Sequence, residues 1–150
     1  MIGAPLDSLI VRRTGSLLVP LVQIFALYVL FFGQYGPGGG FVAGVMISAS
    51  LILGLLVFGG NGLSAKRAKS LLLGDGVGLL LFVAVGGLCL IGGGQFLNYS
   101  EAPIPGLQDA SRRYAGILLT QIGVALDVAV AAVSIVFSLS RSTEGGTSDA

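Results

Sequence analysis

Four long apolar runs, separated by polar or glycine-rich segments, make up most of this sequence. A helix rises about 1.5 Å per residue, so roughly 20 apolar residues cross the hydrocarbon core of a bilayer. Each run is close to that length, and the pattern therefore predicts an all-α integral membrane protein with four transmembrane helices. The predicted spans are residues 16–33, 41–60, 71–93 and 116–140.

The segment Gly36–Phe41, hereafter the elbow, separates the first two runs and holds four glycines and one proline. Glycine weakens a helix through its backbone entropy, and proline lacks the amide donor, so the helix cannot continue here. Lipid tolerates unpaired backbone groups only where protein or water satisfies them. We therefore expect either a tight turn outside the membrane or a packed, partly buried elbow. The residues assigned to this structural turn are Pro37, Gly38, Gly39, Gly40, Phe41 and Gly44.

Composition supports the membrane assignment. The mean hydropathy is +0.95, and only 10% of the 150 residues are charged. A soluble domain carries roughly a quarter charged residues. Eight basic residues nearly balance seven acidic ones, so nothing indicates a nucleic-acid partner.

The residue types present argue against a zinc or redox centre within the chain. The chain has no histidine and a single cysteine, Cys89, which lies inside an apolar run. Zinc, haem and iron–sulfur sites draw mainly on Cys and His, and a disulfide needs a second Cys. We therefore expect no cofactor, and we interpret Cys89 as a small packing residue.

The basic residues predict an orientation. Cytoplasmic loops of membrane proteins carry an excess of Lys and Arg. In a four-span arrangement, six basic residues fall on one side, namely Arg12, Arg13, Lys66, Arg67, Lys69 and Arg141. Only Arg112 and Arg113 fall on the other side. We therefore expect cytoplasmic termini, with one membrane domain over residues 1–140 and a polar cytoplasmic tail over 141–150.

Small residues mark faces on which helices can pack closely. Gly40, Gly44 and Ser48 follow one another at intervals of four in the second span. This small-xxx-small spacing lets two helix backbones approach. Such faces either pack one four-helix bundle internally or dock against other membrane subunits. We also expect the elbow to make a hairpin that sets how the first two spans pack.

The acids within the spans are the chemical candidates. Asp127 lies near the middle of the fourth span and shares one helical face with Thr120 and Ser134. A carboxylate at bilayer depth is costly unless it is paired or protonated. Asp127 is therefore a neutral acid hydrogen-bonded between helices, a direct participant in cation or proton transfer, or half of an ion pair with another subunit. Asp75, about one turn into the third span, is interpreted as solvated or paired at an interface.

Together the candidates for an ion or proton path are Asp127, Thr120, Ser134 and Asp75. No pair of acids has the spacing that hydrolytic acid–base chemistry needs, so we assign no catalytic residue and expect no enzyme activity.

The run Gln34–Gly44 resembles the signature of the MnhB (MrpB) family, because it contains the Pro-Gly-Gly-Gly-Phe sequence of residues 37–41. Residues 92–97 and 122–128 are similar to the glycine-rich exit of that family's third span and the start of its fourth. The resemblance covers about residues 14–140.

The resemblance implies the small B-type component of an Mrp-type multisubunit Na⁺/H⁺ antiporter in a prokaryotic plasma membrane. Its partners would be the other antiporter subunits and the bilayer, with Na⁺ and H⁺ exchanged at the level of the complex. The chain itself would be a non-catalytic subunit that contributes to assembly and to the ion or proton path. Two alternatives stay open: a membrane subunit of a complex-I-like or membrane-bound hydrogenase complex, and a free-standing four-span channel or scaffold.

Overall fold

Helices account for almost all of the regular structure. The computed structural model describes residues 8–58, 65–101 and 108–145, without the side chains of 65–75, 101 and 140–145. The α-helices are α1 (Leu9–Phe32), α2 (Gly40–Phe58), α3 (Ala65–Ile91) and α4 (Asp109–Gly145), and a short 3₁₀ helix η1 (Tyr99–Glu101) precedes α4. The described residues contain no strand. The predicted all-α fold with four long helices is confirmed.

All four helices begin before the predicted spans and α4 ends after its span, whereas α1, α2 and α3 end one or two residues before theirs. α1 begins at Leu9, before the predicted start at residue 16. α4 begins at Asp109, so Arg112 and Arg113 lie in a helix rather than in the predicted loop. Its end at Gly145 makes the first part of the predicted tail helical. Hydropathy marks where a helix meets lipid, whereas hydrogen bonding lets the same helix continue into water.

Three of the described helices are long and apolar enough to cross a membrane. They are α1, α2 and, in α4, the part from Asp109 to Leu139. In α3 the described apolar part runs from Gly76 to Ile91 and is shorter.

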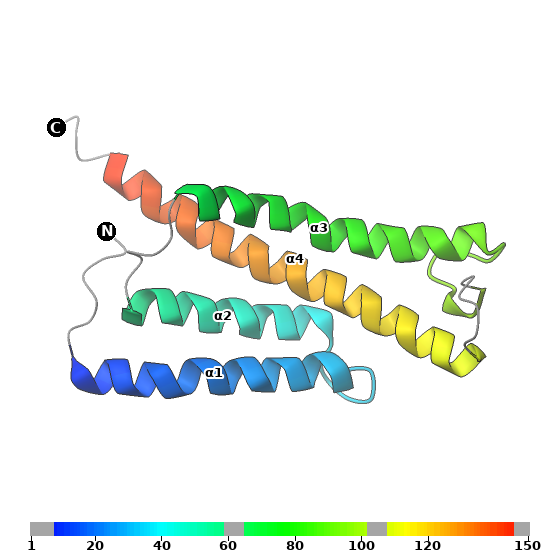
Figure 1. The fold of residues 1–150 in the computed structure, drawn as a ribbon, viewed down its shortest axis with the longest axis horizontal. Coiled ribbons are helices and arrows are strands. Elements are labelled where there is room, and N and C mark those ends of the chain that lie inside the picture. Colours follow the sequence, from blue (N-terminus) through cyan, green and yellow to red (C-terminus); the bar gives the residue numbers. More distant parts are fainter. Residues whose placement is uncertain (1–7, 59–64, 102–107, 146–150) are drawn as a thin grey trace.

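The four helices lie side by side in a row, in the order α1, α2, α4, α3 (Figure 1). Each helix packs mainly against its neighbour in the row, and within the described residues α3 touches neither α1 nor α2. The helices therefore pack against one another within the chain, which is the first of the two packing alternatives, but the described residues form an open row and not a closed bundle. The central apolar cluster is small and joins α1, α2 and α4 through Leu30, Ala43 and Ala125.

Glycines bring α4 into backbone contact with both of its neighbours. On the α2 side, a Cβ added to Gly44 would lie 2.7 Å from the carbonyl oxygen of Ala125, which is closer than real Cβ contacts allow. Gly40 meets the Gln121 backbone in the same way. On the α3 side, Gly78 lies against the backbones of Gly123 and Asp127. The small-residue face of α2 thus packs on α4. The helices α1 and α2, which the elbow joins, also pack on each other, as expected of a hairpin.

The connection between α3 and α4 is anchored by two aromatic rings. After Ile91 the chain turns at Gly93, whose φ is 86°. The ring of Phe96 then packs on Gly86 of α3, and the ring of Tyr99 packs on Gly116 of α4. Cys89, fully buried nearby in α3, donates its S–H to the Val85 carbonyl at 3.3 Å, in accordance with its predicted packing role.

We predict that Gly44→Ala destabilises the isolated protein by about 1–3 kcal/mol, because the new methyl group overpacks the α2–α4 contact. Gly87→Ala is the matched control, since a Cβ there meets no atom within 4 Å. Alanine also favours a helix over glycine by about 1 kcal/mol. Thermal unfolding in detergent, followed by size-exclusion recovery, measures both variants. Equal midpoints for the two variants would contradict the close contact.

Candidate functional site

The elbow is exposed at its tip and packed at its base. Gly36, Pro37 and Gly38 are exposed, whereas Gly39 and Gly40 are buried. The Tyr35 N–H donates to the Phe32 carbonyl at 3.0 Å and closes the end of α1. The segment therefore forms a tight turn at its exposed tip and is packed and partly buried at its base.

Gly39 carries the conformation on which the elbow depends. Its φ is 108°, which L side chains rarely adopt, and its backbone lies directly against Gly33. Its carbonyl accepts the N–H of Ala43 at 3.0 Å, which is the first hydrogen bond of α2. The turn and the start of the next helix therefore share one residue.

The base of the elbow rests on the Gln121 side chain of α4. A Cβ on Gly39 would lie 3.6 Å from Gln121 Oε1. That oxygen is buried and has no hydrogen-bond partner, and the same holds for Gln34 Nε2, two residues before the elbow. An unpaired buried polar group costs roughly 1–3 kcal/mol. Neither amide was among the predicted site residues, although a glutamine inside an apolar span is a signal that could have indicated Gln121.

The Thr120 side chain, next to Gln121 on α4, is held by hydrogen bonds within the chain. Its side chain is 6% exposed, and its Oγ1 lies 2.9 Å from the carbonyls of both Gly116 and Ile117. The Tyr99 hydroxyl lies 3.1 Å from the same oxygen. Because the single Thr120 proton is directed at the carbonyls, Tyr99 is the donor in this pair. Thr120 thus holds η1 onto α4.

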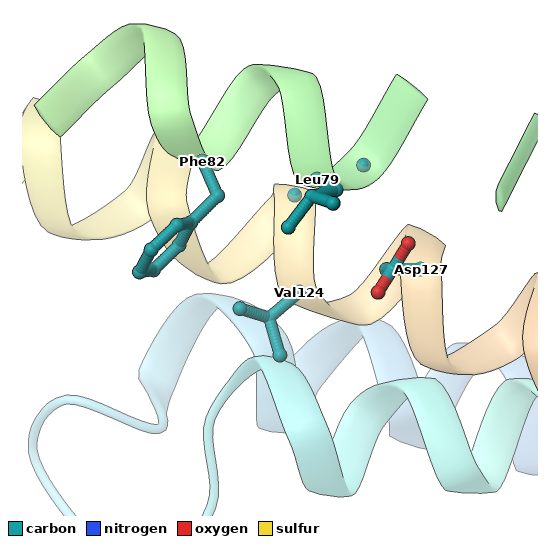
Figure 2. A pocket seen from close by; sticks show the side chains of 6 residues that line it. Leu79, Phe82, Val124 and Asp127 are labelled. Carbon is teal, nitrogen blue, oxygen red and sulfur yellow. The ribbon is translucent and has the colours of Figure 1, made fainter. Parts of the chain in front are cut away.

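Asp127 lines an open groove between α3 and α4. The groove has a volume of about 190 Å³ and is lined by Gly78, Leu79, Phe82, Gly123, Val124 and Asp127. Figure 2 shows the carboxylate between the two helix ribbons, next to Leu79. Asp127 is half-buried, and its carboxylate makes no hydrogen bond or ion pair with another described residue.

The predicted path residues are not gathered into one cavity. Of Asp127, Thr120 and Ser134, only Asp127 lines the groove. Ser134 is half-buried two turns further along α4. Asp75 belongs to α3, but its side chain lies outside the described residues. Within the described part of the chain, no group of three or more acidic, His or Cys residues could hold a metal ion. A role of these four residues in an ion or proton path stays a prediction.

Comparison with known proteins gives a family match over most of the chain. Residues 10–134 match the model of a domain described as related to the MnhB subunit of Na⁺/H⁺ antiporter. The B-type component of the Na⁺/H⁺ antiporter of Bacillus subtilis is 29% identical over 129 residues, which are 81% of this chain and 90% of that protein. Its counterpart in Alkalihalophilus pseudofirmus is 33% identical over 72% of this chain and 80% of the relative. A putative antiporter subunit, mnhB2, of Staphylococcus epidermidis is 26% identical over 89% of this chain and 95% of the relative.

We predict that Gly39→Val destabilises the protein by about 1–3 kcal/mol, because a β-branched residue is strained at a φ of 108°. Gly36→Val is the control, since Gly36 is exposed and a Cβ there meets no atom within 4 Å. The yield of folded protein and its thermal midpoint in detergent report the difference. A Gly39→Val protein as stable as the Gly36→Val protein would argue against a required positive φ.

We further predict that Tyr99→Phe lowers stability by about 1 kcal/mol, since it removes one hydrogen bond while the ring stays on Gly116. Tyr114→Phe in α4 should have a smaller effect, because that side chain is 41% exposed. Limited proteolysis of the α3–α4 connection measures the docking of η1. The same cleavage rate in both variants would show that the hydroxyl does not hold the loop.

Proposed function

Since this chain belongs to the MnhB family of Na⁺/H⁺ antiporter subunits, we propose that it works as the non-catalytic B-type subunit of a multisubunit Na⁺/H⁺ antiporter. It is a multi-pass protein of the prokaryotic plasma membrane, and its partners are the other subunits of the antiporter. The relatives named above are antiporter subunits, and none of them is named for a hydrogenase or a complex-I-like enzyme. We therefore favour the antiporter over the complex-I-like or hydrogenase complex.

The open row of helices is the observation that supports a subunit role. An ion or proton path across a membrane must be shielded from lipid by protein on all sides, because polar groups in hydrocarbon are costly. A single layer of four helices provides a wall and not an enclosure (Figure 1). Any path along this chain would therefore be completed by other subunits. The same geometry speaks against the free-standing channel.

The exposed apolar side chains are arranged in accordance with this role. Large hydrophobic residues are exposed on all four helices, for example Ile24 on α1 at 69% and Leu80 on α3 at 70%. Lipid and neighbouring subunits are the two surroundings that can cover such surface within a membrane. We propose that subunits cover part of it and that the chain contributes mainly to assembly.

We keep the predicted orientation as part of the proposal. Along the direction of the helix axes, the start of α1 and the end of α4 lie on one side of the molecule, and the elbow lies toward the opposite side (Figure 1). Arg12 and Arg13, which are exposed, lie at the end that holds the start of α1. By the excess of basic residues in cytoplasmic segments, this end faces the cytoplasm. The elbow and η1 then face outward.

An affinity-tag experiment tests the proposed function. The tagged chain is expressed with the neighbouring antiporter genes in a host that lacks its own Na⁺/H⁺ exchange. We expect the other subunits to co-purify with it, and everted vesicles to exchange Na⁺ for H⁺ only when the chain is present. Gly44→Leu should reduce both readouts at least tenfold, whereas Gly87→Ala should change neither. A lone, monodisperse chain that retains no other subunit would contradict the proposal.

A further inference from the structure

The groove between α3 and α4 presents a carboxylate that the described chain leaves unpaired. Its walls are otherwise glycine, leucine, phenylalanine and valine, so Asp127 is the one ionisable lining residue. Asp127 also lies near the middle of the predicted span 116–140. A lipid headgroup at either surface is therefore out of reach. A cationic group that pairs with the ionised form of this side chain must itself lie within the membrane.

The groove does not provide a site for an alkali or divalent cation. Hard cations bind several oxygen ligands at once, and Ca²⁺ takes six to eight. Here one carboxylate is the whole supply of side-chain oxygen, because the other lining residues are apolar or glycine. The lining residues belong to α3 and α4, whose backbone carbonyls accept helical hydrogen bonds. A bare cation would therefore be under-coordinated.

The shape of the groove suits the end of a long side chain. A volume of about 190 Å³ far exceeds the roughly 10–15 Å³ that one water molecule needs. Gly78 and Gly123 form part of its wall, where the backbones of α3 and α4 are in close contact. Leu79, at the rim, is 58% exposed. The groove has apolar walls at Leu79, Phe82 and Val124 and one acidic group at Asp127. A side chain with an aliphatic stem and a cationic head can contact both.

We propose that this groove receives a lysine or arginine side chain from a transmembrane helix of a neighbouring antiporter subunit. The inference rests on the proposed function, because it requires that the chain is assembled with other membrane subunits. The cationic head pairs with the Asp127 carboxylate, and the aliphatic stem covers the apolar walls. The pair stabilises both charges, since each alone would be unpaired at bilayer depth. Asp127 is thus a docking residue between subunits.

Substitution of Asp127 tests the pairing. Asp127→Asn keeps the shape of the side chain but removes its charge, whereas Asp127→Glu keeps the charge. We expect Asp127→Asn to lower the recovery of at least one partner subunit tenfold or more in the affinity-tag experiment. Asp127→Glu should recover more than half of the wild-type amount. Asp109→Asn, the same exchange at an exposed position at the start of α4, is the matched control and should change nothing.

Cross-linking identifies the partner residue. A photo-reactive amino acid at Leu79 is activated in membranes that contain the whole complex, and the linked peptide is sequenced. We expect a transmembrane peptide with a lysine or arginine. Changing that residue to Asp in an Asp127→Lys background should restore assembly, which neither change alone permits. A peptide without a basic residue, or cross-links to lipid alone, would overturn the inference.

The outcomes separate this inference from the proposed function. If wild-type chain retains its partners and Asp127→Asn retains them equally, the docking role is wrong while the subunit role stands. If Asp127→Asn assembles fully but everted vesicles lose Na⁺/H⁺ exchange, Asp127 belongs to the ion or proton path and the docking role is again wrong. If the wild-type chain retains no partner, the proposed function fails and the docking role fails with it.

Discussion

Direct backbone contact between α4 and its two neighbours is the constraint on which the rest of the structure depends. Gly40 and Gly44 allow α2 to approach one side of α4, and Gly78 meets Gly123 on the other side. Lipid chains are as apolar as the helices, so burial of apolar surface does not hold membrane helices together, whereas close packing does. A single methyl group at these positions would move two helices apart.

The close packing of α4 on α2 and α3 also determines the surroundings of the polar side chains on α4. Because α2 begins so close to α4, the buried base of the elbow lies on Gln121, whose Oε1 remains without a partner. Where Gly78 meets Gly123 and the backbone of Asp127, the two helices border the groove that the Asp127 side chain lines. Thr120 binds η1 on the same helix. α4 therefore packs against both of its neighbours and also carries the polar side chains of Thr120, Gln121 and Asp127.

Much of the fold could be predicted from residue patterns. Apolar runs predicted four helices, and the glycines of the elbow predicted a turn that the φ of Gly39 now provides. Helix ends were predicted less well: α4 begins at Asp109 and ends at Gly145, because hydrogen bonding continues where contact with lipid ends. The candidate site was predicted in part. The shared face of Thr120, Asp127 and Ser134 follows from helical periodicity, but periodicity does not reveal which side chains the fold already engages.

The sequence by itself determined the membrane class, the four helices, the turn and the resemblance to a family, because each is written in local hydropathy, backbone freedom or a short motif. Only the tertiary structure decided the order of the helices, the contact of the small-residue face with α4, and the opposite situations of Thr120 and Asp127. The physical reason is that a small-xxx-small spacing predicts close approach by another helix backbone but does not identify that helix. The partner is selected by the shapes of whole helix surfaces, which are formed by residues far apart in the chain.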